Sequence, residues 1–252
     1  MSPLHRILKS EFKVTFVLLF VNAVLFFLIT VLASVFGTSQ LNILYLFGAE
    51  YFPDIIGGAF WRVVLPAFLH ANLLHFFLNM WALANIGPYV ESFYGWRKLF
   101  TVYVVTGIFA SLLSVFVTAV DYFGSNGANT DFAISIGSSG AIFGLVGLLL
   151  GNNYKNDTYS LKIPIDSSQL WIFVAVNIVF GFGVNSIGGS IGINNAAHVG
   201  GLLSGFVLGM VLNPVNTFHV SKLKKYFEKG LFYFALLAVI VSAILNIITN
   251  FS

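Results

Sequence analysis

The stretch that decides the fold is residues 138–152, which read SSGAIFGLVGLLLGN. It is apolar between its polar ends and carries two pairs of glycines, each pair four residues apart: Gly140 and Gly144, then Gly147 and Gly151. In a helix this spacing places small residues on one face, where a second backbone can approach closely. Fifteen residues make a helix of about 22 Å, shorter than the roughly 30 Å hydrocarbon core of a bilayer. The stretch therefore predicts a short membrane helix whose first residues lie below the outer surface.

The composition of the whole chain agrees with a membrane protein. Hydrophobic residues make up 58% of the 252 residues, charged residues only 8%, and the mean hydropathy is +0.91. A soluble domain has about 25% charged residues, so an ordinary cytosolic enzyme is excluded. The chain has no cysteine, which excludes disulfides and thiolate metal sites. Its basic residues are dispersed and form no aromatic-interleaved patch, so we expect no nucleic-acid partner.

Seven apolar stretches are candidates for spanning helices, which need about 20 mostly apolar residues. They lie near residues 14–36, 72–90, 99–120, 136–151, 169–184, 195–212 and 230–249. The segment 37–71 is apolar and aromatic but is broken by prolines and glycines, which is typical of a membrane-interfacial or re-entrant loop. We therefore expect an all-α, polytopic transmembrane bundle forming one domain over 1–252, with a core of about 14–212 and an additional C-terminal span.

The distribution of basic residues predicts the orientation of the bundle, because cytoplasmic loops retain lysine and arginine. With the N-terminus in the cytoplasm and seven spans, all of the 12 basic residues except Arg62 fall on the cytoplasmic side. The C-terminus then lies outside. We expect an integral multi-pass protein of the cell membrane, and favour a bacterial plasma membrane.

Polar residues inside membrane helices are costly and mark functional positions. Such residues occur in the first two turns of three predicted helices that run from outside to inside: His75, Asn79, Ser139 and His198. The topology therefore brings them to one depth. A second glycine face follows His198, so close packing of 138–152 against 195–212 predicts that the Ser139 hydroxyl and the His198 imidazole lie within hydrogen-bond reach.

This arrangement predicts serine-protease chemistry. A histidine of ordinary pKa near 6.5 can accept the proton of a serine hydroxyl, so Ser139 is the expected nucleophile and His198 its base. We expect a dyad, because every aspartate falls in a predicted loop: Asp54, Asp121, Asp131, Asp157 and Asp166. His75 and Asn79 share a helix face and can donate to the oxyanion together with the Ser139 backbone N–H.

Other hydrolase mechanisms fail on the residues available. A zinc protease of the His-Glu-x-x-His type needs glutamate after its first histidine, but alanine follows His70, phenylalanine follows His75 and valine follows His198. An aspartyl protease needs two carboxylates at one site, and no predicted helix carries an aspartate. We therefore expect no metal and no cofactor. Each feature alone also has a plainer interpretation: the glycine-serine stretch as helix packing, and the histidines as a proton relay or as ties between helices.

Taken together, the residues resemble the rhomboid intramembrane serine proteases from about Trp61 to Gly205. The matching motifs occur in the family's order: Trp61-Arg62 in the loop, His70, His75 and Asn79 as His-x4-His-x3-Asn, Glu91 and Gly95 as Glu-x3-Gly, residues 137–140 as Gly-x-Ser-Gly, and Ala197, His198, Gly201 and Gly205 as Ala-His-x2-Gly-x3-Gly. The resemblance implies the same roles for Ser139, His198, His75 and Asn79, and places Phe143 under the histidine ring, where tyrosine is frequent in the family. It assigns structural roles to Trp61, Arg62 and Glu91.

The resemblance also implies a substrate and a topology. The substrate would be a transmembrane segment of another protein, cut near its outer end after a small side chain, and the last span resembles the bacterial six-plus-one arrangement. The glycine-rich stretch 185–194 is a candidate flexible cap. Two alternatives stay open: a catalytically inactive rhomboid-like protein that binds client proteins for trafficking or degradation, and, ranked lower, a transporter with a histidine relay. The oligomeric state is left open.

Overall fold

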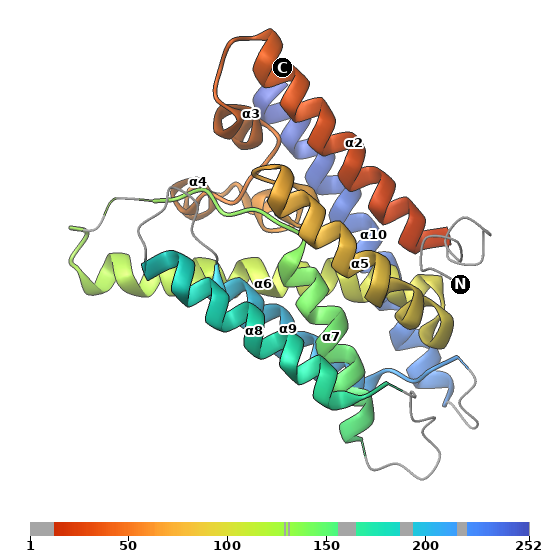
Figure 1. The fold of residues 1–252 in the computed structure, drawn as a ribbon. Coiled ribbons are helices and arrows are strands. Elements are labelled where there is room, and N and C mark those ends of the chain that lie inside the picture. The colour runs from red at the N-terminus through yellow and green to blue at the C-terminus, as the bar shows by residue number, and fades with distance from the viewer. Residues whose placement is uncertain are drawn as a thin grey trace.

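The computed structural model describes residues 13–128, 130, 132–155, 165–186, 194–215 and 221–251. These residues form a helical bundle (Figure 1) with no strand among them, apart from one isolated bridge between Glu50 and Ser135. All seven predicted spans are helices: α2 (Lys13–Val35), α5 (Leu73–Tyr94), α6 (Trp96–Gly124), α7 (Ser139–Tyr154), α8 (Ser167–Ser186), α9 (Asn195–Val211) and α10 (Lys222–Phe251). The predicted all-α bundle is confirmed.

Among the residues that the structure describes, three helices are long and apolar enough to cross a membrane by length and composition: α2, α6 and α10. They expose large apolar side chains, among them Phe20, Phe116 and Leu237, which are 58%, 62% and 60% exposed. Exposing this much apolar surface to water is unfavourable, whereas contact with lipid tails is favourable. The chain is therefore an integral membrane protein.

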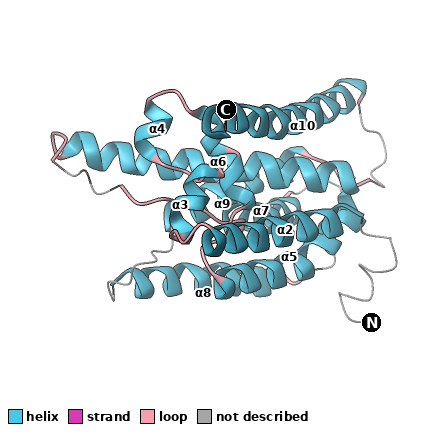
Figure 2. Ribbon diagram, turned by 90° about the horizontal axis from the view of Figure 1, so that it is seen from above, coloured by secondary structure: helices cyan, strands magenta, loops and turns pink. Residues whose placement is uncertain are grey.

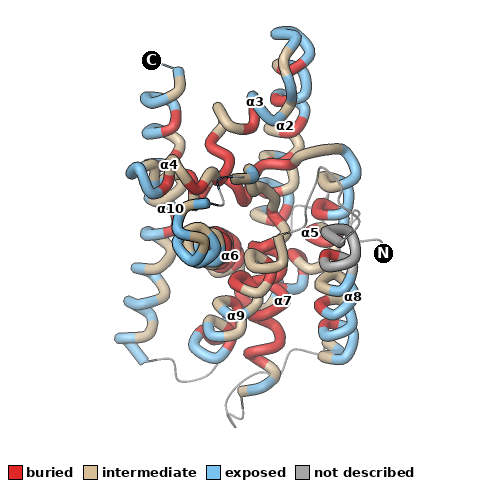
Figure 3. Tube along the Cα trace, turned by 90° about the vertical axis from the view of Figure 1, so that its left-hand side faces the viewer, coloured by how far each residue is buried: buried red, intermediate tan, exposed pale blue. Residues whose placement is uncertain are grey.

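Helix α7 lies in the middle of the bundle. Seen from above in Figure 2, the other helices surround it, and Figure 3 shows it buried over most of its length while α8 and α10 are largely exposed. Every residue from Gly140 to Asn152 is buried. Sixteen residues make it about 24 Å long, as expected for a helix that does not reach both membrane surfaces.

Glycines bring α7 and α9 into backbone contact. A Cβ atom on Gly201 would overlap the carbonyl oxygen of Gly140, and one on Gly205 would overlap that of Gly144. The same holds for Gly209 against the carbonyl of Leu148. The two glycine faces seen in the sequence therefore face each other, and their contact sets the distance between the two helices.

The loop predicted between the first two spans contains four short helices: α3 (Gln40–Leu46), α4 (Phe52–Ile56), η1 (Phe60–Val63) and η2 (Leu65–Phe68). The loop folds around the buried guanidinium of Arg62. This group lies 3.0 Å from a carboxylate oxygen of Asp54 and donates to the carbonyls of Tyr45 and Ala49, both at 2.9 Å. One cation thus ties three turns of the loop together.

A buried carboxylate anchors the start of α2. Glu91, near the end of α5, accepts hydrogen bonds from the backbone N–H of Val14 at 2.9 Å and of Thr15 at 2.8 Å, and from the Thr15 hydroxyl at 2.7 Å. The first N–H groups of a helix have no partner within it, and a negative charge there is favourable. The contact joins the start of α2 to the end of α5.

Two helices extend further than hydropathy predicts. Helix α10 begins at Lys222 rather than near residue 230, and Lys98 of α6 pairs with its Glu228 at 3.0 Å. Helix α6 continues to Gly124, so Asp121, predicted to lie in a loop, is in its last turn. Asp54 likewise lies in the short helix α4. In α6 and α10 the polar end of the helix lies beyond the apolar stretch on which the prediction rested, whereas α4 is a short helix within the predicted loop.

Candidate active site

Two side chains from the central helices meet at the N-terminal ends of α7 and α9. Ser139 is the first residue of α7, and His198 lies in the first turn of α9. The Nε2 atom of His198 lies 2.9 Å from the Ser139 hydroxyl oxygen, and His198 is only 6% exposed. The contact follows from the glycine packing, because Ser139 precedes Gly140 and His198 lies three residues before Gly201.

The imidazole of His198 is held by an aromatic ring. Phe143, one turn into α7, stacks on it with ring centroids 4.3 Å apart and planes only 4° from parallel. The other ring nitrogen, Nδ1, is buried and has no hydrogen-bond partner among the described residues. Stacking therefore orients the ring at this site, and no described carboxylate bonds to it.

His75 lies beside the serine, and Gly137 leaves room for it. A Cβ atom on Gly137 would lie 2.7 Å from Cε1 and 2.8 Å from Nε2 of His75, and 3.6 Å from the Ser139 hydroxyl oxygen. Gly137 also has a φ of +130°, which side chains rarely allow. The first glycine of the Gly-x-Ser-Gly motif is thus required both by its backbone conformation and by the neighbouring imidazole.

Asn79 lies one turn after His75 on α5. It is buried, and its Nδ2 makes no hydrogen bond to any of the described residues. A buried amide donor normally has a partner, so this group is suited to a ligand atom. The structure therefore brings His75 to the Ser139–His198 pair and places Asn79 on the same helix one turn further in.

A second histidine supports the site from the loop. The Nε2 atom of His70 lies 3.1 Å from the hydroxyl of Ser138, and its ring packs edge-on against that of His75 with centroids 5.3 Å apart. The backbone N–H of Gly137 donates to the carbonyl of Pro66 at 2.9 Å. The loop that carries Arg62 thus holds the segment that enters α7.

Two polar residues near the site were not singled out in the sequence. Glu50 is buried in the loop, and Asn194 caps α9 by accepting from the N–H of Ala197 at 2.9 Å. An asparagine just before an apolar stretch is an N-cap signal, whereas a lone glutamate in a loop carries none. Of the predicted flexible cap 185–194, residues 187–193 lie outside the described part of the chain.

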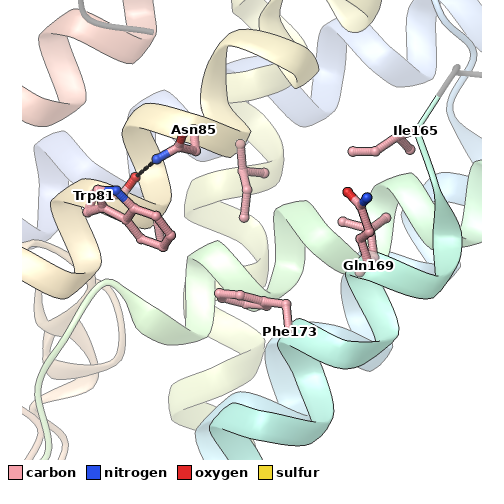
Figure 4. Close-up of a pocket in the computed structure, with 8 residues that line it drawn as sticks. Trp81, Asn85, Ile165, Gln169 and Phe173 are labelled. Atoms are coloured by element: carbon pink, nitrogen blue, oxygen red, sulfur yellow. Dashed lines mark hydrogen bonds between the residues drawn. The ribbon is translucent and has the colours of Figure 1, made fainter. Parts of the chain in front are cut away.

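A pocket lies between α5 and α8, apart from the four predicted residues (Figure 4). Figure 4 shows Trp81 and Asn85 on one side, with Gln169 and Phe173 on the other. Its lining is mainly apolar, as expected next to lipid. Phe173 also packs against Phe143 with ring centroids 5.6 Å apart, so the pocket is connected to the His198 ring through two aromatic side chains.

The fold and the site define a helical membrane protein with a serine and a histidine hydrogen-bonded at one end of its central helices. The described residues contain no group of three His, Cys, Asp or Glu side chains able to hold a metal ion. The family model described as the Rhomboid domain matches residues 57–215, more than half of the chain. The chain therefore belongs to the rhomboid family.

Its relatives include named proteases. Rhomboid-like protease 2 of Toxoplasma gondii is 34% identical over 68% of this chain and 54% of its own length. Rhomboid protease GluP of Bacillus subtilis (strain 168) is 30% identical over 79% of this chain and 35% of its own length. RHOMBOID-like protein 4 of Arabidopsis thaliana is 34% identical over 70% and 40%. The matched part spans about a third to just over half of these relatives. They come from very different organisms, so the bacterial plasma membrane and the orientation stay predictions.

Proposed function

We propose that this protein is an intramembrane serine endopeptidase that cleaves transmembrane segments of other membrane proteins with Ser139 and His198. One observation carries the proposal: the buried imidazole of His198 lies 2.9 Å from the hydroxyl of Ser139 and is stacked on an aromatic ring. The two residues lie at the starts of two helices that are in backbone contact. A nucleophile needs such a contact with its base. The family membership and the named proteases among the relatives support the same function.

The proposed mechanism begins with proton transfer. The Ser139 hydroxyl gives its proton to Nε2 of His198 and its oxygen attacks the carbonyl carbon of the scissile peptide bond. The negative charge that develops on the carbonyl oxygen is stabilised by hydrogen bonds from His75, from the Asn79 Nδ2, which has no partner among the described residues, and from the Ser139 backbone N–H. His198 then donates its proton to the leaving amine nitrogen as the peptide bond breaks. An acyl-enzyme on Ser139 remains.

Hydrolysis of the acyl-enzyme repeats these steps with water. His198 accepts a proton from the water as its oxygen attacks the ester, and returns it to the Ser139 oxygen when the ester bond breaks. Stacking on Phe143 keeps the imidazole in place in both halves of the reaction. A catalytic dyad of serine and histidine, without a third residue, is consistent with the Nδ1 of His198, which has no partner among the described residues.

The site sets requirements on the substrate. A peptide bond within a helix is hydrogen-bonded and shielded, so a segment of weak helix propensity unwinds into the site at lower cost. From the resemblance to rhomboid proteases we expect a small side chain before the cleaved bond. The same resemblance leads us to expect cleavage near the outer end of a transmembrane segment.

The experiment that tests the proposal labels the purified protein with a mechanism-based serine-hydrolase probe and locates the adduct by mass spectrometry. We expect labelling at Ser139 that disappears in Ser139→Ala and in His198→Ala. The matched control is Ser204→Ala, because this hydroxyl on α9 donates to the carbonyls of its own helix at 2.8 and 3.0 Å. It should label like the wild type.

The same samples separate the enzyme from the inactive client-binding alternative. They are incubated with a protein that carries a cleavable transmembrane segment. Cleavage by wild type and Ser204→Ala, but not by Ser139→Ala, supports the protease. Folded wild-type protein that neither labels nor cleaves would contradict it and favour client binding.

A further inference from the structure

A buried glutamate lies where the interfacial loop meets the segment that leads into α7. Glu50 is only 5% exposed. Its backbone pairs with that of Ser135 in both directions, since each N–H donates to the carbonyl of the other residue at 3.0 Å. Ser135 lies four residues before Ser139. The backbone of Glu50 thus holds the approach to the proposed nucleophile.

The side chain of Glu50 reaches the approach to the proposed base. The hydroxyl of Ser114, on α6, donates to the Glu50 carboxyl. Ser114 accepts in turn from Nδ2 of Asn194 at 2.6 Å, and the same amide group donates to the Ser135 hydroxyl at 2.9 Å. Asn194 lies four residues before His198. Three side-chain hydrogen bonds and the backbone pair of Glu50 with Ser135 connect four residues in a closed set of contacts, which we call the Glu50 network: Glu50, Ser114, Ser135 and Asn194.

We propose that the Glu50 network is a positioning device that, together with the glycine contacts, sets the separation of Ser139 and His198. The inference rests on the proposed protease function. Neither Glu50 nor Asn194 contacts the reacting atoms. Each acts through the start of a helix, because Ser135 leads into α7 and Asn194 caps α9 through the Ala197 N–H.

The network acts in addition to the glycine contacts, which set the distance between the two helices. These contacts hold α7 and α9 together along their length, from Gly201 to Gly209. The proposed catalytic pair lies before those contacts, at the helix ends, where backbone N–H groups lack partners within the helix. The Glu50 network adds a tie between the two helix ends, next to the 2.9 Å contact of Ser139 with His198.

Folding of the loop does not depend on Glu50 alone. Arg62 holds the adjacent carbonyl of Ala49 and that of Tyr45. A change at Glu50 therefore leaves the main anchor of the loop in place, so the two roles can be separated by experiment.

The environment of the Glu50 carboxyl provides a readout that a purely structural role would not give. Burial raises the pKa of Glu50 to about 7, against the opposing effect of the Ser111 and Ser114 hydroxyls of α6. These hydroxyls and the Ser135 backbone face it, and no charged side chain of the described residues is bonded to it. The carboxyl therefore changes its charge near neutral pH, and as a carboxylate it accepts a stronger hydrogen bond from Ser114.

The test uses two variants of the full chain, assayed for kcat and KM on a transmembrane substrate in lipid vesicles. Asn194→Asp keeps the oxygen that caps α9 but cannot donate to Ser114 and Ser135. We expect its kcat to fall by about tenfold, with KM and the melting temperature close to wild type, since small misplacements of reacting groups cost one to two orders of magnitude. The matched control is Asn177→Ala, because the Asn177 amide donates to its own helix.

The second variant keeps the test decisive if the first fails to fold. Glu50→Gln has the shape of the protonated acid, so we expect its kcat to match wild type at pH 6 and to fall severalfold below it at pH 8. A kcat ratio that is the same at both pH values, or wild-type kcat in Asn194→Asp, would overturn the positioning role.

The outcome for wild type separates this inference from the proposed function. Cleavage by wild type but not by Ser139→Ala keeps the protease, whatever the network variants do. Cleavage that persists in Ser139→Ala would refute Ser139 as the nucleophile of the proposed protease, and the positioning role with it.

Discussion

Gly201 tests how closely α7 and α9 must pack for the site to form. In Gly201→Ala the new Cβ would overlap the Gly140 carbonyl oxygen and lie 2.8 Å from its carbon. Carbon atoms in contact normally lie 3.5 to 4.0 Å apart, so the two helices must separate by about 1 Å. The obstacle is backbone on a buried helix, so no side-chain rotation relieves it.

The separation acts directly on the proposed catalytic pair. Ser139 precedes Gly140, and His198 lies less than one turn from Gly201, so their 2.9 Å contact would lengthen to about 3.9 Å, beyond hydrogen-bond range. We expect kcat to fall by about 100-fold. Overpacking costs about 1 to 3 kcal/mol of stability, and the better helix propensity of alanine returns at most about 1 kcal/mol. The melting temperature should therefore fall only modestly, whereas kcat falls about 100-fold.

The assay compares Gly201→Ala with Gly230→Ala, measuring kcat on a transmembrane substrate and thermal melting in the same detergent. A Cβ on Gly230 of α10 meets nothing within 4 Å, so this variant controls for the change of residue type. It should keep wild-type kcat. Wild-type kcat in Gly201→Ala would refute the argument, because it would show that α7 and α9 need not touch for the site to work.

Three further predictions concern the surroundings of the site. Phe143→Leu removes the ring stacked on His198 and should lower kcat about tenfold at unchanged KM; steady-state kinetics that match wild type would exclude a role for stacking. Arg62→Ala leaves the Asp54 carboxylate without its cation and should cost about 3 kcal/mol, seen as a lower melting temperature; a melt equal to wild type would contradict the anchoring role. Burial raises the pKa of Glu50 from 4.5 to about 7, so the folded chain retains a proton that the unfolded chain releases. Stability worth about 3 kcal/mol is then lost as the pH rises through this range, and the wild-type melting temperature should fall more than that of Glu50→Gln between pH 5 and 8.

The helices of the bundle were predictable because a membrane imposes a simple requirement on sequence. Each span needs a long apolar stretch, and each of the seven stretches is a helix in the structure. Hydropathy does not report polar helix ends, which is why α10 begins earlier and α6 ends later than predicted. The short helices within residues 37–71 could not be predicted either, because Arg62 holds this loop through carbonyl groups up to 17 residues away in sequence.

Part of the candidate site could be predicted from the sequence, and part of it could not. Depth in the membrane and glycine spacing predicted that Ser139 and His198 lie within reach, and their side-chain atoms are 2.9 Å apart. The catalytic roles themselves stay predictions. Glu50 and Asn194 were missed because their partner Ser114 is 64 and 80 residues away in sequence and occupies an otherwise unremarked position on α6. Contacts between loops and helix ends follow no periodic pattern.

The enclosure of α7 has a consequence for how the protein sits among lipids. A helix of 16 residues exposed to lipid would force the bilayer to thin around it or the helix to be drawn out of place, a hydrophobic mismatch. Because α7 is buried from Gly140 to Asn152, it makes no such demand, and the 23 to 30 residues of α2, α6 and α10 meet the acyl chains instead. Lipid chain length is therefore expected to influence Ser139 through the tilt of these outer helices.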